Sequence, residues 1–392
     1  HRPTLVGSAL LAATLLFIQH PSMSSSLSLD RHSHIATTWN AVEHDSSGIP
    51  RIDPPRSGHV AFSVDNSDGL ASRPYVFGGY CEEEDGSGNG GVVRSATNEL
   101  WTWLGDAGGW EKVEQNGEVP GPRLASAAVV LGGRPYLFGG WDPQTAGTGG
   151  VILDSVHRLD PSTHTWSKLS TSVPGGPTSR HVALTLLGCT DCIIHNHRCS
   201  DYVLVFCSET EEFREQKTTG EAPSPRGLHS AVMCGRYAVV FGGAGQTGAM
   251  SNEAFLLDTE SWKWTKLRFE ASAQPADAPS PRAASCLCSV SSDCVLLFGG
   301  AETTESGLKG RADLWALHFD ADSGIGRWEL LIAHDSEGKS DNVLPQPRNA
   351  ATFSEIEVAT DAGNGRNFLL QGGWAPFRTT WADSYVLNVQ KE

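Results

Sequence analysis

The chain has 392 residues, of which 45 are acidic and 29 basic, and its formal net charge is −16. This charge argues against a nucleic-acid-binding protein, because a polyanion would be repelled unless basic side chains gathered on one face. With 43 Gly, 21 Pro and 12 Trp but 3 Met, the composition predicts many short strands joined by turns, and hence an all-β fold.

Residues 1–34 are expected to form a leader that is either disordered or targeting-like. Residues 5–18, LVGSALLAATLLFI, have the length of a signal-peptide core and are too short for a comfortable membrane span. Met23 is an alternative start of translation. The 9 cysteines show no paired framework and the sequence lacks an Asn-x-Ser/Thr sequon, which favours reduced thiols and a cytoplasmic protein. The secretory pathway or an organelle is the alternative if the apolar run is a targeting signal.

A four-part pattern repeats from residue 55 onward. Five apolar strands end in a Gly pair: PYVFGGY (74–80), PYLFGGW (135–141), AVVFGGA (238–244), LLFGGA (296–301) and FLLQGGW (368–374). Pro-Arg, or Ser179-Arg180 in one unit, opens the strand before the Gly-pair strand. A third strand such as NELWTW (98–103) and a fourth with an aromatic residue, such as WKWTKLR (262–268), follow the Gly pair. Each unit therefore predicts four short strands.

The opening arginines are 46 residues apart at the closest, from Arg180 to Arg226, and 67 apart from Arg56 to Arg123. A unit of about 50 residues with insertions is the kelch period. Together with the Gly pairs and the later Trp residues, this spacing resembles the kelch-repeat β-propellers over residues 35–390. The resemblance implies one propeller with four-stranded blades near 56–114, 123–169, 179–217, 225–268, 281–332 and 347–389. The third unit departs from the pattern, and there we expect His197 and Arg198 in place of the Gly pair.

The segment IATTWNAVEHD (35–45) precedes the first unit, and the last unit lacks a fourth strand. Residues 37–43, TTWNAVE, have the alternation of the fourth strands. We therefore expect this segment to complete the last blade, which would close a six-bladed propeller and remove a free sheet edge. A disordered leader is the alternative.

The predicted ligand site is the face that carries the Pro-Arg openings and the long loops after the Gly pairs. Six arginines would ring the mouth of the channel, where they could bind carboxylates through both guanidinium nitrogens: Arg56, Arg123, Arg180, Arg226, Arg282 and Arg348. Resemblance to kelch domains that bind acidic peptide motifs implies a similar role. The structural alternative is that each arginine caps carbonyl groups of a neighbouring blade or pairs with an acid between blades. His59, His181 and His229 would line the channel, more as hydrogen-bonded structural residues than as ligands.

Two other patterns resemble chemical sites. The segment CTDCIIHNHRC contains Cys189, Cys192, His195, His197 and Cys199, but alternate residues of a strand face opposite sides, so we expect no metal there. The loop GSGNGG (86–91) lacks the helix that would bind phosphate.

The sequence thus predicts a protein- or peptide-binding scaffold without cofactor, metal or membrane span, acting as a monomer, with an acidic motif as one option for its partner. An enzyme or sugar-binding protein acting on a small molecule in the channel mouth is the alternative.

Overall fold

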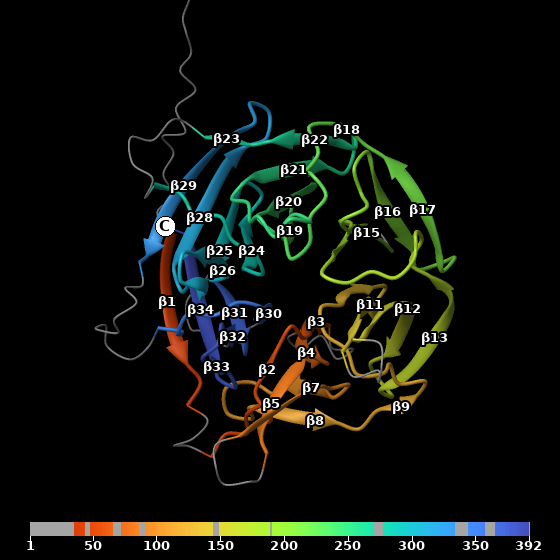
Figure 1. Ribbon diagram of the computed structural model, residues 1–392. Helices are drawn as coiled ribbons and strands as arrows, with labels where there is room; N and C mark the ends of the chain where they lie inside the picture. Colours follow the sequence, from red (N-terminus) through yellow and green to blue (C-terminus); the bar gives the residue numbers. More distant parts are fainter. Residues whose placement is uncertain are drawn as a thin grey trace, which may run out of the picture.

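The fold is all-β, as the composition predicts. The computed structural model describes residues 35–43, 48–65, 72–85, 91–143, 149–188, 190–269, 277–333, 344–356 and 365–391. All the regular elements in these ranges are strands. The described residues contain no helix that could cross a bilayer. Figure 1 shows the sheets following one another around a ring, an arrangement consistent with a β-propeller.

Six large antiparallel sheets, numbered here in chain order, form the ring within the described residues. The first contains β3 (Val60–Val64), β4 (Arg73–Phe77), β7 (Leu100–Trp103) and β8 (Trp110–Val113), and the second β10 (Ala127–Leu131), β11 (Arg134–Asp142), β12 (Val151–Asp160) and β13 (Thr165–Ser172). The third contains β14 (Val182–Thr185), β15 (Asp191–His195), β16 (Tyr202–Cys207) and β17 (Glu212–Lys217), and the fourth β19 (Ser230–Cys234), β20 (Tyr237–Phe241), β21 (Ala254–Asp258) and β22 (Lys263–Lys266). The fifth contains β24 (Cys286–Ser291), β25 (Cys294–Phe298), β28 (Leu314–Asp320) and β29 (Ile325–Ile332), and the sixth β30 (Thr352–Ile356), β31 (Arg366–Gln371), β34 (Ser384–Lys391) and β1 (Ile35–Ala41).

Shorter strands extend these sheets. One set forms small sheets in the loops: β2 (Arg56–Ser57) with β5 (Tyr80–Glu84) and β6 (Val92–Ala96), β26 (Ala301–Thr304) with β27 (Gly307–Gly310), and β32 (Trp374–Ala375) with β33 (Thr379–Thr380). The other set pairs in parallel with outer strands: β9 (Asn116–Gly117) with β13, β18 (Thr219–Gly220) with β22, and β23 (Arg268–Phe269) with β29.

The core lies between neighbouring sheets, in apolar clusters that each join two of them. Phe77 of the first sheet packs on Trp166 of the second at 5.2 Å between ring centroids, for example. Corresponding clusters join the second sheet to the third, the third to the fourth, the fourth to the fifth, the fifth to the sixth and the sixth to the first. Because both faces of a sheet are covered, inner strands such as CVLLF (294–298) are continuous apolar runs rather than alternating ones.

The segment before the first unit forms β1, and it pairs with the C-terminal strand β34. The antiparallel register runs from Ile35 opposite Lys391 to Ala41 opposite Tyr385. Trp39 is buried against Phe298 of the fifth sheet, with 5.1 Å between the ring centroids. The aromatic residue that suggested a fourth strand therefore packs in the core between the fifth and sixth sheets.

The Gly pairs lie where one sheet meets the next. Gly299 has a φ of +67°, and a Cβ atom there would lie 2.7 Å from the carbonyl oxygen of Arg348 in the following unit. The next residue, Gly300, donates its N–H to that same oxygen at 2.9 Å. A side chain would prevent this approach, which explains why glycine recurs at this position of the unit.

Candidate functional site

One face of the ring carries both the openings of the units and the loops that follow the Gly pairs. Isolated β-bridges join them within four units: Leu124 with Trp141, Gly227 with Ala244, Ala283 with Ala301, and Asn349 with Trp374. In the first unit, Arg56 of β2 pairs with Cys81 of β5. We call this the loop-rich face.

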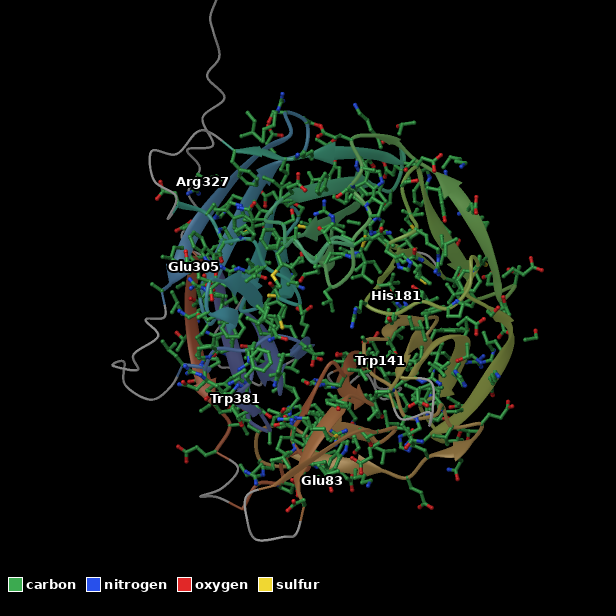
Figure 2. The ribbon with its side chains drawn as sticks, in the orientation of Figure 1. Glu83, Trp141, His181, Glu305, Arg327 and Trp381 are labelled. Carbon is green, nitrogen blue, oxygen red and sulfur yellow. The ribbon has the colours of Figure 1, made fainter. Side chains whose placement is uncertain are left out.

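The loop-rich face is uneven around the ring. Small hairpins rise from the first, fifth and sixth units, and β11 and β12 continue past the Gly pair in the second, where Trp141 pairs with Ile152. Phe377 lies in the β32–β33 turn with 80% of its surface exposed, beside Trp374. Figure 2 shows Trp381 of the sixth unit towards the outside of the ring and His181 next to its centre.

Five of the six predicted arginines are buried, with 0 to 5% of their surface exposed. Each donates from Nη1 to the carbonyl of the first glycine of its own Gly pair: Arg56 to Gly78 (3.3 Å), Arg123 to Gly139 (3.0 Å), Arg226 to Gly242 (3.1 Å), Arg282 to Gly299 (3.0 Å) and Arg348 to Gly372 (3.0 Å). These contacts hold the opening of a unit to its own second strand.

Four of these arginines also form an ion pair with a carboxylate that directly precedes the third strand of their own unit. The pairs are Arg56–Glu99 (2.7 Å), Arg226–Glu253 (2.8 Å), Arg282–Asp313 (2.7 Å) and Arg348–Asp383 (2.6 Å). Arg123 donates instead to Ser155 Oγ at 3.2 Å. The five arginines thus bind carbonyl groups, and four of them acids, as the structural alternative to ligand binding predicted. The partners belong to the same unit, however, and not to a neighbouring one. A ligand-binding role for these arginines stays a prediction.

The ion pairs shift the pKa values of their members. Burial alone would raise the pKa of Asp313, but the hydrogen bonds and charge of Arg282 hold it below its ordinary value. The Lys266 ammonium, followed by Arg226 and Ser251, lowers the pKa of Glu253 to about 2 against the effect of its own burial. Burial lowers the pKa of Arg123 to about 10, and the charge of Asp142 opposes that shift only in part. Arginine binds a carboxylate wherever the unit supplies one.

Arg180 does not occupy the position of the other five arginines, and the prediction that grouped it with them is wrong. Thr178 stands there: it is fully buried, and its carbonyl accepts the N–H of Gly140 at 2.9 Å, as the Arg123 carbonyl accepts that of Gly79. Arg180 is exposed and has a φ of +58°. The sequence offered a charged residue two positions after a threonine, and the spacing alone could not show which of the two was equivalent to arginine.

Arg180 belongs to a circle of six residues with positive φ: Gly58, Ala125, Arg180, Leu228, Ala284 and Ala350. Each donates its N–H to the carbonyl of the residue from the preceding unit at 2.8 or 2.9 Å, and Gly58 completes the circle by donating to Ala350. The guanidinium of Arg180 forms no hydrogen bond or ion pair with the rest of the described chain, and it is the only charge in the circle. It is thus the one predicted arginine that is open to a ligand.

The third unit also lacks the Gly pair, but with a different register from the one predicted. Val182 pairs with His195 as Cys286 pairs with Phe298, so Asn196 and His197, rather than His197 and Arg198, stand where the glycines should be. By the same register Tyr202 takes the place of the carboxylate that precedes the third strand. The third unit has therefore lost the arginine and its acid together.

The three predicted histidines are buried, with 4 to 5% of their surface exposed. His59 Nε2 lies 3.0 Å from Thr352 Oγ1, and His229 Nε2 lies 3.1 Å from His195 Nδ1. Burial, with the charge of Arg56, lowers the pKa of His59 to about 3. His181 also has a pKa of about 3, first because of burial and then because of the Arg198 and His197 charges. All three are neutral near pH 7.

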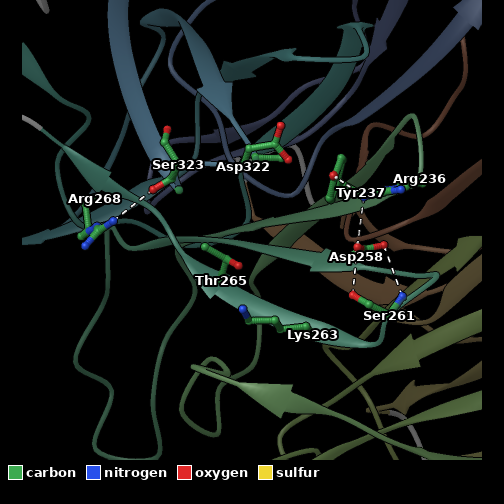
Figure 3. A pocket seen from close by; sticks show the side chains of 11 residues that line it. Arg236, Tyr237, Asp258, Ser261, Lys263, Thr265, Arg268, Asp322 and Ser323 are labelled. Carbon is green, nitrogen blue, oxygen red and sulfur yellow. Dashed lines mark hydrogen bonds and ion pairs between the residues drawn. The ribbon is translucent and has the colours of Figure 1, made fainter. Parts of the chain in front are cut away.

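Two hollows accompany this architecture. A cavity of about 410 Å³ is lined by the first strands of all six sheets, with Phe62, Leu184 and Phe353 among its residues. A polar pocket of about 390 Å³ lies where the β21–β22 turn of the fourth sheet meets the β28–β29 turn of the fifth. Its lining holds three basic side chains, Arg236, Lys263 and Arg268, and two acidic ones, Asp258 and Asp322, and Figure 3 shows Arg268 beside Ser323.

The zinc-like segment does not gather its side chains in the structure. His195 contacts His229, and the Cys199 thiol lies 3.8 Å from the Ile194 carbonyl. Cys189 lies outside the described residues. Across the described ranges, no group of three or more His, Cys, Asp or Glu residues is placed to hold a metal ion.

Comparison with known proteins gives a consistent pattern. The family model described as the KLHDC2/KLHL20/DRC7 Kelch-repeats domain matches residues 22–194 and 188–391. Kelch domain-containing protein 2 of Bos taurus is 28% identical over 294 residues, which are 66% of each chain. Kelch domain-containing protein 1 of Mus musculus is 28% identical over 273 residues, 62% of this chain and 63% of the relative. The chain therefore spans just under two thirds of each relative. A solved structure titled "Structure of YjhT" is 16% identical, with a TM-score of 0.59 over 88% of this chain and 99% of that one, and shows a similar fold.

Proposed function

The chain belongs to the kelch-repeat proteins of the KLHDC2/KLHL20/DRC7 Kelch-repeats domain family, and from this premise we propose that it is a propeller scaffold that binds a protein or peptide on its loop-rich face. Kelch domains commonly mediate protein interactions, and the relatives are themselves kelch domain-containing proteins.

We propose that residues 35–390 form one six-bladed propeller, with β1 as the fourth strand of the last blade. Three observations support this proposal. The six core clusters each join neighbouring sheets, the six backbone hydrogen bonds form a complete circle, and β1 pairs with β34 over seven residues. The carbonyl of Arg56 also accepts the N–H of Gly373 at 2.9 Å, which joins the last unit to the first.

We propose that the ligand contacts Arg180 at the centre of the loop-rich face. The observation that carries this is that Arg180 alone of the six predicted arginines is exposed and free of a carboxylate partner among the described residues. In a chain of net charge −16, an unpaired guanidinium surrounded by Gly58, Ala125 and Leu228 would attract an acidic group. The buried arginines then hold the rim in shape, and the exposed aromatic Phe377 adds contact area from the hairpin wall.

The experiment is affinity capture of partners by the intact protein, followed by binding measurements with the recovered partner. Arg180→Ala should weaken binding by about 2 to 5 kcal/mol if the contact is desolvated, and the wild-type affinity should fall as salt is added. Arg134→Ala is the matched control, because Arg134 is also an exposed arginine but lies at the start of β11, in the turn after β10. Unchanged affinity in Arg180→Ala would place the ligand elsewhere.

A small molecule in the central cavity is the second candidate, and the cavity of about 410 Å³ favours it. Its wall includes the Arg366–Glu355 ion pair, and Arg366 also donates to the Ser289 carbonyl. A thermal-shift screen of metabolites and sugars on the protein without partner would reveal such a ligand. For the location we propose the cytoplasm, because seven described cysteines are free thiols, six of them buried: Cys81, Cys192, Cys199, Cys207, Cys234, Cys286 and Cys288.

A further inference from the structure

The outer strands of the six large sheets differ in how their free edges are protected. The edges of β13, β22 and β29 are each covered by a two-residue parallel strand from the same chain. β17 carries charges along its length, with the sequence EFREQK, and the four-residue β8 contains Glu111 and Lys112. Short, charged or covered edges prevent a sheet from pairing with another chain.

β1 has none of these protections within the described residues. Its seven residues, IATTWNA, include no charge, and Figure 1 shows the strand on the outer rim of the ring. Thr38 and Asn40 are exposed, whereas Ile35 and Trp39 are buried towards the fifth sheet. A long, uncharged and β-prone edge is a template for a further strand.

The ladder with β34 fixes which backbone groups of β1 face outward. Val42 donates its N–H to the Ser384 carbonyl at 3.0 Å, one step beyond the pair Ala41–Tyr385. Because hydrogen-bonded and non-hydrogen-bonded pairs alternate in an antiparallel ladder, every second residue back from Val42 bonds to β34. The residues between them, Thr37, Trp39 and Ala41, direct their N–H and C=O groups away from the sheet.

We propose that β1 pairs antiparallel with β1 of a second copy of this chain, which joins two rings through one continuous sheet at their rims. A register centred on Thr38 pairs all seven residues and leaves Glu43 outside. It places Thr38 opposite the partner's Thr38, and Thr37 opposite the partner's Trp39. The outward groups of Thr37 then bond to the outward groups of Trp39, and the reverse, as a two-fold axis requires.

Among the outer strands of the six large sheets, the uncharged β1 is the one where two copies meet with the least repulsion. Two chains of net charge −16 repel each other, and an uncharged strand lets them approach without placing like charges face to face. The dimer should therefore become stronger as salt screens the remaining repulsion, the opposite of the salt dependence expected for the ligand at Arg180. The sequence alone predicts a monomer, because it identifies this segment as a fourth strand but does not show whether its outer edge is covered.

Sedimentation velocity of the full chain between about 1 and 100 µM tests the proposal, since a single strand pair gives a weak dimer whose fraction rises with concentration. Thr38→Lys places two ammonium groups opposite each other and should return the protein to one chain at all concentrations. Its folding is checked by an unchanged melting temperature, because the Thr38 side chain is exposed.

Two cysteine variants test the register. In a non-hydrogen-bonded antiparallel pair the Cα atoms lie about 4.5 Å apart, within the range of a disulfide. Under a mild oxidant, Thr38→Cys should therefore give a covalent dimer, whereas Asn40→Cys, which would face the partner's Ala36, should not. A dimer that survives Thr38→Lys, or that is not trapped by Thr38→Cys, uses another surface and overturns the proposal. A monomer at every concentration also overturns it, and slow hydrogen exchange at Thr37 and Trp39 would then show that the chain covers its own edge.

Discussion

Replacing Arg282 by alanine should destabilise the protein far more than the same change at Arg180. Arg282 is buried and donates five hydrogen bonds, to the Gly299 carbonyl, both Asp313 oxygens, and the carbonyl and hydroxyl of Ser280. Without it, the partners that the buried Asp313 carboxylate keeps among the described residues are Trp315 Nε1 at 2.8 Å and the more distant Arg311 at 3.5 Å. Breaking a buried pair on one side costs about 3 to 5 kcal/mol. Arg180→Ala removes an exposed side chain without such contacts and should cost at most about 0.5 kcal/mol.

Denaturant unfolding of both variants beside the wild type, followed by tryptophan fluorescence, measures the difference. The effect of Arg282→Ala should shrink as the pH falls towards about 3.9, the ordinary pKa of an aspartate. The reason is that Arg282 lowers the pKa of Asp313 in the wild type, whereas in the variant the buried carboxyl group is relieved by taking up a proton. Equal destabilisation by Arg282→Ala and Arg180→Ala would refute the assignment of one arginine to structure and the other to the surface.

Three further predictions concern other parts of the fold. Deleting residues 1–45 should lower the melting temperature by removing β1, whereas deleting 1–34 should not; equal melting temperatures would show that β1 contributes no stability. The neutral, buried His59 has a pKa of about 3, so stability should fall as the pH drops from about 6.5, where only the unfolded chain gains the proton; a His59→Gln variant should lose about 1.4 kcal/mol less per pH unit, and an unchanged slope would contradict this. Gly299→Ala should cost more than Gly132→Ala, because both residues have positive φ but only Gly299 lies against a carbonyl oxygen; unfolding midpoints that shift equally would count against this contact.

Much of the fold could be predicted because the unit repeats. The opening arginines, the apolar second strands, the Gly pairs and the third strands recur in the same order in five units, and the family and the all-β fold follow from them. The Trp39 segment could be recognised as a strand because its aromatic residue matches those of the fourth strands. β1 and its partner β34 lie at opposite ends of the sequence, and their pairing agrees with that expectation.

The candidate site was less predictable, because the exposure of each arginine depends on the contacts that it makes within its folded unit. The acids that hold the arginines were visible in the sequence as Glu99, Glu253, Asp313 and Asp383, each just before a third strand, but their role appears only when the chain folds back. Two predictions for the third unit were wrong: the position of Arg180, and the register of the residues that replace the Gly pair. In both places a residue of the wrong kind stood one or two positions from the equivalent one.

The third unit lacks the arginine–carboxylate pair and the Gly pair, so we expect its local stability to be lower than that of the other units. Thr178 and Tyr202 replace an ion pair, and Asn196 and His197 replace the Gly pair. The buried Thr178 hydroxyl and the His181 ring nitrogens form no hydrogen bond of normal geometry with the rest of the described chain. Because the missing contacts lie within a unit, local opening should begin in the segment that starts the third unit, around Thr178 and His181, rather than where the two chain ends meet. Arg180 lies in the same part of the ring, so a partner bound to it would stabilise the unit that has the fewest internal contacts.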